Sequence, residues 1–148
     1  MTKDALKFFH AYINEMIDIG GQNLPKAISS KLGTKLGRIY KERGVIDLES
    51  GLIKSFKVLK GNPKILKKND NEFDINIKYR NRGFCPIGGR YNPERGELVQ
   101  KCLCVPFYLG FVSELYPKFK YTIRVQECIL NKNTNYCKFV LNINSQDL

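Results

Sequence analysis

The sequence lacks several features that would mark particular classes of protein. No apolar stretch reaches the roughly eighteen uninterrupted residues of a membrane-spanning helix, so we expect no membrane partner. The single histidine, His10, lies in a helical stretch, which argues against a histidine general base or a haem ligand. Glu94, Glu97, Glu114 and Glu127 are dispersed, without the pairing that acid–base catalysis requires. We therefore identify no catalytic residue, and an enzyme is not the favoured class.

A secretory leader and a closed cysteine framework are also missing. Lys3, Asp4 and Lys7 interrupt the N-terminal apolar stretch, so we expect a cytoplasmic chain. Thiols stay reduced in that compartment. The five cysteines are odd in number, which argues against a closed disulfide framework. They include no CxxC pair, so their spacing alone does not favour a metal site. The cysteines would then be buried in the core, bind a metal ion or take part in redox chemistry.

Acidic residues are few beside the basic ones. The 25 lysines and arginines give the chain a net charge of +11, which would suit a nucleic-acid partner. The basic residues are nevertheless spread at spacings typical of solvated helix faces. Lysine also outnumbers arginine, the residue favoured for bidentate phosphate and base recognition. We therefore predict that nucleic acid is not the partner, and that any binding to duplex DNA largely vanishes near physiological salt.

The N-terminal part of the chain is predicted to be helical. Apolar residues recur at three- and four-residue spacing in three stretches, separated by glycines. The expected helices cover about residues 6–19, 23–43 and 47–60. Gly33 and Gly37 lie four apart inside the second helix, where each costs about 1 kcal/mol relative to alanine. The pair would let another backbone or a ligand approach closely, and close helix packing is the simpler explanation.

The remainder alternates between strand and helix patterns. A period of two replaces the helical period after Pro63, a loop rich in glycine and proline follows over 80–97, and Pro106 suits the first turn of a fourth helix. The expected strands cover 64–68, 73–79, 118–125 and 137–143. The sequence therefore predicts one α+β domain over residues 1–148. In it, N-terminal helices precede an antiparallel sheet of two hairpins with a central helix between them.

Two of the cysteines, Cys102 and Cys104, come just before the fourth predicted helix. Inside a helix their side chains would point about 200° apart, so both can reach one site only if the helix begins after them. A start at Pro106 satisfies that condition. Cys104 would then lie at a helix N-terminus, which lowers the pKa of a thiol.

The other two, Cys128 and Cys137, flank the last predicted turn. A two-residue turn at Lys132-Asn133 would place them directly opposite each other, with Cβ atoms about 5 Å apart. Strict alternation along the preceding strand would instead put Glu127 on the core face. We therefore predict a β-bulge near Glu127 that reconciles the two patterns.

These features together resemble the C-terminal signature of the 4-vinyl reductase domain family. The matching elements are Cys102-Leu-Cys104, a helix containing Gly110, Gln126-Glu127-Cys128, a polar turn, and Cys137-Lys138-Phe139. The turn Asn131–Asn135 departs from the family pattern, which has glycine and aspartate there. The resemblance implies a hydrocarbon-binding sensor domain, fused in some members to a transcription regulator and in some binding zinc. It also implies a fold similar to the subunits of the TRAPP trafficking complex and, more remotely, to haem nitric-oxide sensors.

With that resemblance, the cysteines predict a structural zinc site, since zinc favours four nitrogen or sulfur ligands. The candidate ligands are Cys102, Cys104, Glu127, Cys128 and Cys137. Glu127 or Cys102 would supply the fourth position, and Cys85 is the reserve ligand if Cys102 points away. The alternative is that these thiols are small buried hydrophobes.

The favoured function is therefore binding of a small apolar molecule, in a pocket lined by Phe107, Phe111 and Tyr121 between the helices and the sheet. A protein-interaction adaptor with a filled core and a nucleic-acid-binding protein using its basic helices remain alternatives. We expect a homodimer formed through the N-terminal helices, because the first helix is apolar on more than one face. A regulatory partner protein is also expected, since the sequence shows no separate output domain.

Overall fold

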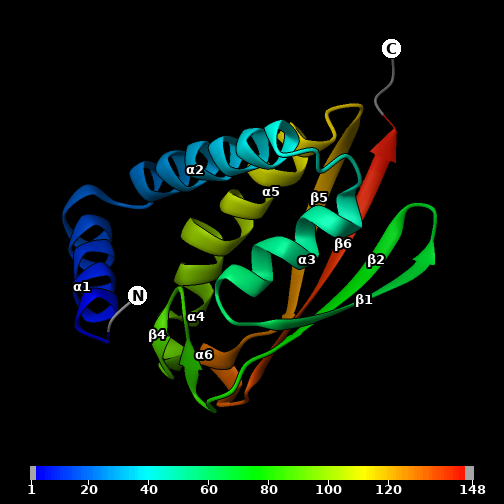
Figure 1. Cartoon of the computed structure of the whole chain (residues 1–148). Helices are drawn as coiled ribbons and strands as arrows, with labels where there is room; N and C mark the ends of the chain where they lie inside the picture. The colour runs from blue at the N-terminus through cyan, green and yellow to red at the C-terminus, as the bar shows by residue number, and fades with distance from the viewer. Residues whose placement is uncertain (1–2, 146–148) are drawn as a thin grey trace.

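Three helices begin the fold in the computed structural model, which describes residues 3–145. They are α1 (Lys3–Gly20), α2 (Asn23–Glu42) and α3 (Leu48–Val58). The third helix begins at a side-chain cap, because Asp47 Oδ1 accepts a hydrogen bond from the Ser50 backbone N–H at 2.7 Å. Figure 1 shows α1 turned away from α2 at one end of the molecule, while α3 lies against the sheet.

The main sheet has four antiparallel strands in the order β1-β2-β6-β5. These are β1 (Asn62–Asn69), β2 (Glu72–Lys78), β5 (Phe119–Glu127) and β6 (Tyr136–Ser145). Phe139 of the central strand β6 pairs with Ile75 of β2 on one side and Val125 of β5 on the other. Helices cover one face of the sheet (Figure 1), so the predicted α+β class is confirmed.

The segment between the two halves of the sheet is more ordered than the predicted loop. It contains a small hairpin, β3 (Phe84–Cys85) with β4 (Gly89–Arg90), and then α4 (Pro93–Val99). The helix continues through a π-helical turn, η1 (Gln100–Cys104), into α5 (Val105–Leu115). The predicted helix start at Pro106 is therefore wrong. The wide π-helical turn directly before Pro106 accommodates a residue that has no N–H and whose ring would crowd the preceding turn.

The continuous helical run Pro93–Leu115 lies at the centre of the fold. It is long and apolar enough to cross a membrane by length and composition alone, and 44% of its most apolar stretch is buried in the fold. The C-terminal part of this run, α5, packs chiefly against α2 and the sheet.

Glycines bring the backbones of α2 and α5 unusually close together. A Cβ atom at Gly37 would lie 2.8 Å from the Phe111 carbonyl oxygen, and one at Gly33 would overlap the carbonyl of Phe107. From the other side, a Cβ at Gly110 would overlap the carbonyl of Ser30. This confirms close helix packing as the reason for the glycine pair in α2.

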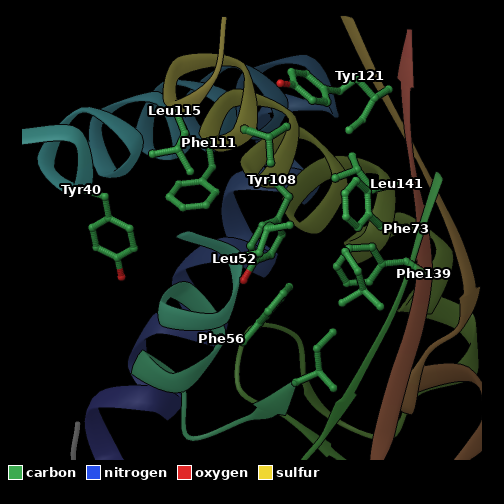
Figure 2. Packing of buried hydrophobic residues seen from close by; sticks show 14 of the residues in the cluster. Tyr40, Leu52, Phe56, Phe73, Tyr108, Phe111, Leu115, Tyr121, Phe139 and Leu141 are labelled. Carbon is green, nitrogen blue, oxygen red and sulfur yellow. The ribbon is translucent and has the colours of Figure 1, made fainter. Parts of the chain in front are cut away.

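Two clusters of buried side chains make up the core. The larger one lies between α3, α5 and the sheet, and Figure 2 shows Phe56, Tyr108 and Phe139 meeting there. Their ring centroids are 4.8 to 6.0 Å apart. The smaller cluster lies under α1 and η1 and gathers all five cysteines, three of them fully buried.

Candidate functional site

A cavity of about 50 Å³ lies where the two core clusters meet. Its apolar wall comes from α3, the sheet and the central helical run, through side chains such as Phe56, Ile77, Val99 and Ile123. The β3–β4 hairpin closes one side with Ile87. Helices, sheet and hairpin therefore all contribute to the wall of this cavity.

A few polar groups border this cavity. Burial raises the pKa of the Tyr108 and Tyr79 hydroxyls, so both stay protonated at physiological pH. The Tyr108 hydroxyl is hydrogen-bonded to the side chain of Ser55, which itself donates to the Leu52 carbonyl oxygen at 2.7 Å. An apolar wall with a small number of fixed polar groups suits a mainly apolar ligand that carries one polar atom.

Four thiols from four segments border the same cavity. Cys85 comes from β3, Cys104 from the end of η1, Cys128 from the residue before α6 (Ile129–Lys132), and Cys137 from β6. Cys102 is fully buried but does not border the cavity. Cys102 and Cys104 lie within one continuous helical run, so their side chains point in different directions. Cys85, the reserve ligand, borders the cavity in place of Cys102.

The turn between Cys128 and Cys137 differs from the two-residue turn that we predicted. The short helix α6 fills it and ends at Asn133, whose φ is 51°. The predicted bulge is confirmed, because the β5–β6 register shifts by one residue between Val125 and Glu127. The extra residue returns the Cys128 side chain to the core side, where its thiol meets that of Cys137.

The electrostatic surroundings of the thiols are unequal. Hydrogen bonds from Cys137 and from Gln100 lower the pKa of Cys128 below the usual range for a thiol. The same interaction, together with burial, raises the pKa of Cys137. Burial also raises the pKa of Cys104. Our expectation of a lowered Cys104 pKa is therefore wrong, because Cys104 lies inside a continuous helical run and not at a helix N-terminus.

Glu127 lies away from the thiols, beside basic residues of the adjoining segments. Its carboxylate is 3.5 Å from Lys132 Nζ and 3.9 Å from Lys138 Nζ. A hydrogen bond with Tyr136 and these two ammonium groups lower the pKa of the carboxyl group. Lys132 and Lys138 are therefore its charge partners, where we had expected a metal ion.

The residues predicted to line a ligand pocket lie beside the observed cavity but do not border it. Phe111 and Tyr121 are buried in the larger core cluster, and Phe107 packs half-buried against it. Tyr108, one residue from Phe107, faces the cavity in their place. The π-helical turn shifts the helical register just before this point, which the sequence pattern does not reveal.

Metal-binding geometry is not preassembled in the described residues. Within 3–145, no three histidine, cysteine, aspartate or glutamate side chains are arranged to hold an ion. The zinc site remains a prediction.

Comparison with known proteins identifies relatives of the fold. No family model matches the chain, and no curated protein does. A trafficking protein particle complex subunit 3 from Naegleria fowleri, covalently bound to palmitic acid, superposes with a TM-score of 0.63 at 12% identity, over 97% of this chain and 96% of that one. The chain has the fold of that subunit.

A second solved structure shares this fold. The phenol-responsive sensory domain of the transcription activator PoxR, solved with phenol, gives a TM-score of 0.60 at 15% identity over 93% of this chain and 74% of that one. The expected likeness to TRAPP subunits is therefore confirmed. Membership of the 4-vinyl reductase family remains a prediction.

Proposed function

We propose that the chain is a sensor domain that binds a small, mainly apolar molecule in its core cavity. The observation that carries this proposal is the cavity itself, enclosed by apolar side chains from helices, sheet and hairpin, with the Tyr108 hydroxyl as a polar group at its wall. Two proteins of the same fold support it, since one was solved with phenol and the other with palmitic acid.

The size of the cavity suggests how a ligand would be sensed. A dry cavity of about 150 Å³ accommodates benzene, whereas this one measures about 50 Å³. A ring-sized ligand must therefore displace part of the wall. The two-residue strands of the β3–β4 hairpin, which carry Cys85 and present Ile87, are the shortest elements around the cavity. Ligand binding would move this hairpin and signal occupancy to a partner protein.

The hairpin is also in contact with α1. His10 Nε2 lies 3.2 Å from the Pro86 carbonyl oxygen, and the His10 ring packs edge-on against Phe84. A displaced hairpin would therefore disturb the first helix, which provides a route from the cavity to the surface.

Phenol is a direct probe of this proposal. We expect phenol to raise the melting temperature of the wild-type chain, and Val99→Phe to abolish that rise because the larger ring fills the cavity. Val58→Phe is the matched control, since Val58 is 70% exposed on α3 and should leave phenol binding intact. Thermal unfolding with and without phenol measures the rise in melting temperature, and calorimetric titration measures the affinity for phenol. Absence of any phenol-induced stabilisation would favour the filled-core adaptor alternative.

A conservative variant separates shape from polarity in the same titration. Tyr108→Phe keeps the ring and removes the hydroxyl, so we expect phenol affinity to fall by about 10-fold. Benzene, which cannot use the hydroxyl, should bind both forms alike. If Tyr108→Phe lost affinity for phenol and benzene equally, the substitution would have damaged the fold.

A structural zinc ion is a second candidate, favoured by the four thiols around one cavity. The donor set fits zinc, which four thiolates bind in closed structural sites. Here Cys85 would take the fourth position that we had predicted for Cys102 or Glu127. The thiols would have to draw together for the ion to bind, because they are not arranged to hold one in the structure. The ion would then tie the hairpin, the central helix and β6 together.

Metal analysis of protein prepared without chelator tests this candidate. We expect about one zinc per chain, and Cys85→Ser or Cys137→Ser should lower zinc content and melting temperature together. Cys102→Ser is the matched control and should leave zinc content unchanged, because Cys102 does not border the cavity. Well under one zinc per wild-type chain would show that the thiols only pack the core.

A further inference from the structure

We propose that the groove between α1 and α2 binds a second copy of this chain, forming a two-fold symmetric dimer. The groove is separate from the core cavity and has a volume of about 550 Å³. Apolar side chains from both helices line it, together with Leu103 from η1. In Figure 1, α1 projects from the body at one end of α2. Most of the residues that line the groove belong to these two helices.

The apolar lining of this groove is strongly exposed. On α1, Tyr12 is 73% exposed and Ile19 is 84% exposed, while Leu24 and Leu32 on α2 are 50% and 52% exposed. These residues follow the helical period of each helix, so they form two neighbouring stripes. Contiguous apolar patches of this kind are uncommon on monomeric soluble proteins and mark interaction sites.

The solvent-accessible surface of the chain is larger than that of a compact monomer of the same mass. A compact monomer of this mass exposes about 7,800 Å², whereas this chain exposes 9277 Å². The surplus of roughly 1,500 Å² exceeds the area of about 800 Å² that each partner loses in a standard interface. A dimer that covers the groove between α1 and α2 would bury part of this surplus.

Charge favours a second copy as the occupant. Glu15 lines the groove from α1, while α2 presents exposed lysines, among them Lys31 and Lys35 beside Leu32. In a two-fold symmetric dimer, α1 of each chain would lie against α2 of its partner, so an acidic side chain would meet a basic helix twice. The apolar stripes would pair in the same arrangement.

Light scattering of the full chain during size-exclusion chromatography tests the proposal. At tens of micromolar we expect the wild type to be a dimer and Ile19→Glu to be a monomer, with a dissociation constant raised by at least about 30-fold. Ile46→Glu is the matched control, since Ile46 is equally accessible at 78% exposure but lies outside the groove, between α2 and α3. It should remain dimeric.

Loss of the dimer in Ile19→Glu can be distinguished from unfolding, because Ile19 is exposed and its replacement should leave the fold intact. Circular dichroism verifies that the variant is folded. Leu32→Glu provides a second disruption from the α2 side of the groove. A monomeric wild type overturns the proposal and leaves the groove to a different protein. A dimer that survives Ile19→Glu and Leu32→Glu also overturns it, because the dimer must then form through another surface.

Discussion

Replacing Gly33 with alanine is expected to lower the free energy of unfolding by about 3 kcal/mol. The added methyl group would overlap the backbone carbonyl of Phe107, which belongs to α5 and cannot rotate away as a side chain would. Alanine is intrinsically better in a helix than glycine by about 1 kcal/mol. A net loss of stability in urea denaturation would therefore report the close approach of the two helices.

Gly20→Ala is the control for this substitution. A Cβ atom at Gly20, the last residue of α1, would meet only the Leu24 side chain, at an ordinary contact distance of 3.7 Å. We expect no loss of stability there. If Gly33→Ala were as stable as the wild type, the close packing of α2 and α5 would be disproved.

Phe56→Ala is expected to destabilise the fold by about 3–5 kcal/mol, and benzene should restore part of that loss. Phe56 is only 2% exposed, packs against Tyr108 and Phe139, and borders the cavity. Its removal would enlarge a space that is now too small for an aromatic ring, and an apolar space of sufficient size binds benzene. Thermal unfolding followed by circular dichroism, with and without benzene, measures both effects.

Val58→Ala tests whether the effect is specific to the buried face of α3. Val58 lies two residues further along the same helix and is 70% exposed, so its truncation should change stability little, and benzene should stabilise this variant no more than the wild type. A Phe56→Ala protein that benzene stabilises no more than the wild type would argue against a dry apolar cavity at this position.

The main elements of the fold were predictable because they follow from short-range patterns. The glycines at 20 and 21 end α1, Asp47 caps α3, and alternation around Ile75 and Ile77 marks β2. The bulge before Glu127 was also predictable, since two patterns in one strand conflicted and only an extra residue reconciles them. The segment 80–97 was not, because its strands have two residues each and are set by pairing rather than by periodicity.

The candidate site was harder to predict because it depends on helix register. Continuation of the helix through η1 separates Cys102 from Cys104 and turns Tyr108, rather than Phe107, toward the cavity. A proline at 106 is compatible with a helix start or with the turn after a π-helical segment, and no local signal distinguishes the two. Cys85 reaches the other thiols only through the fold of the hairpin, so its sequence neighbours give no sign of that contact.

The position of β6 has a consequence for how the protein is made. This strand is the last element of the fold in the chain, yet it lies inside the sheet between β2 and β5. Until it leaves the ribosome, the apolar faces of β2 and of α5 have no complete sheet to cover them, and the inner edges of β2 and β5 remain open to other strands. This domain must therefore stay in a partly folded state until β6 has been translated, and the step that completes its core comes only after that strand is available.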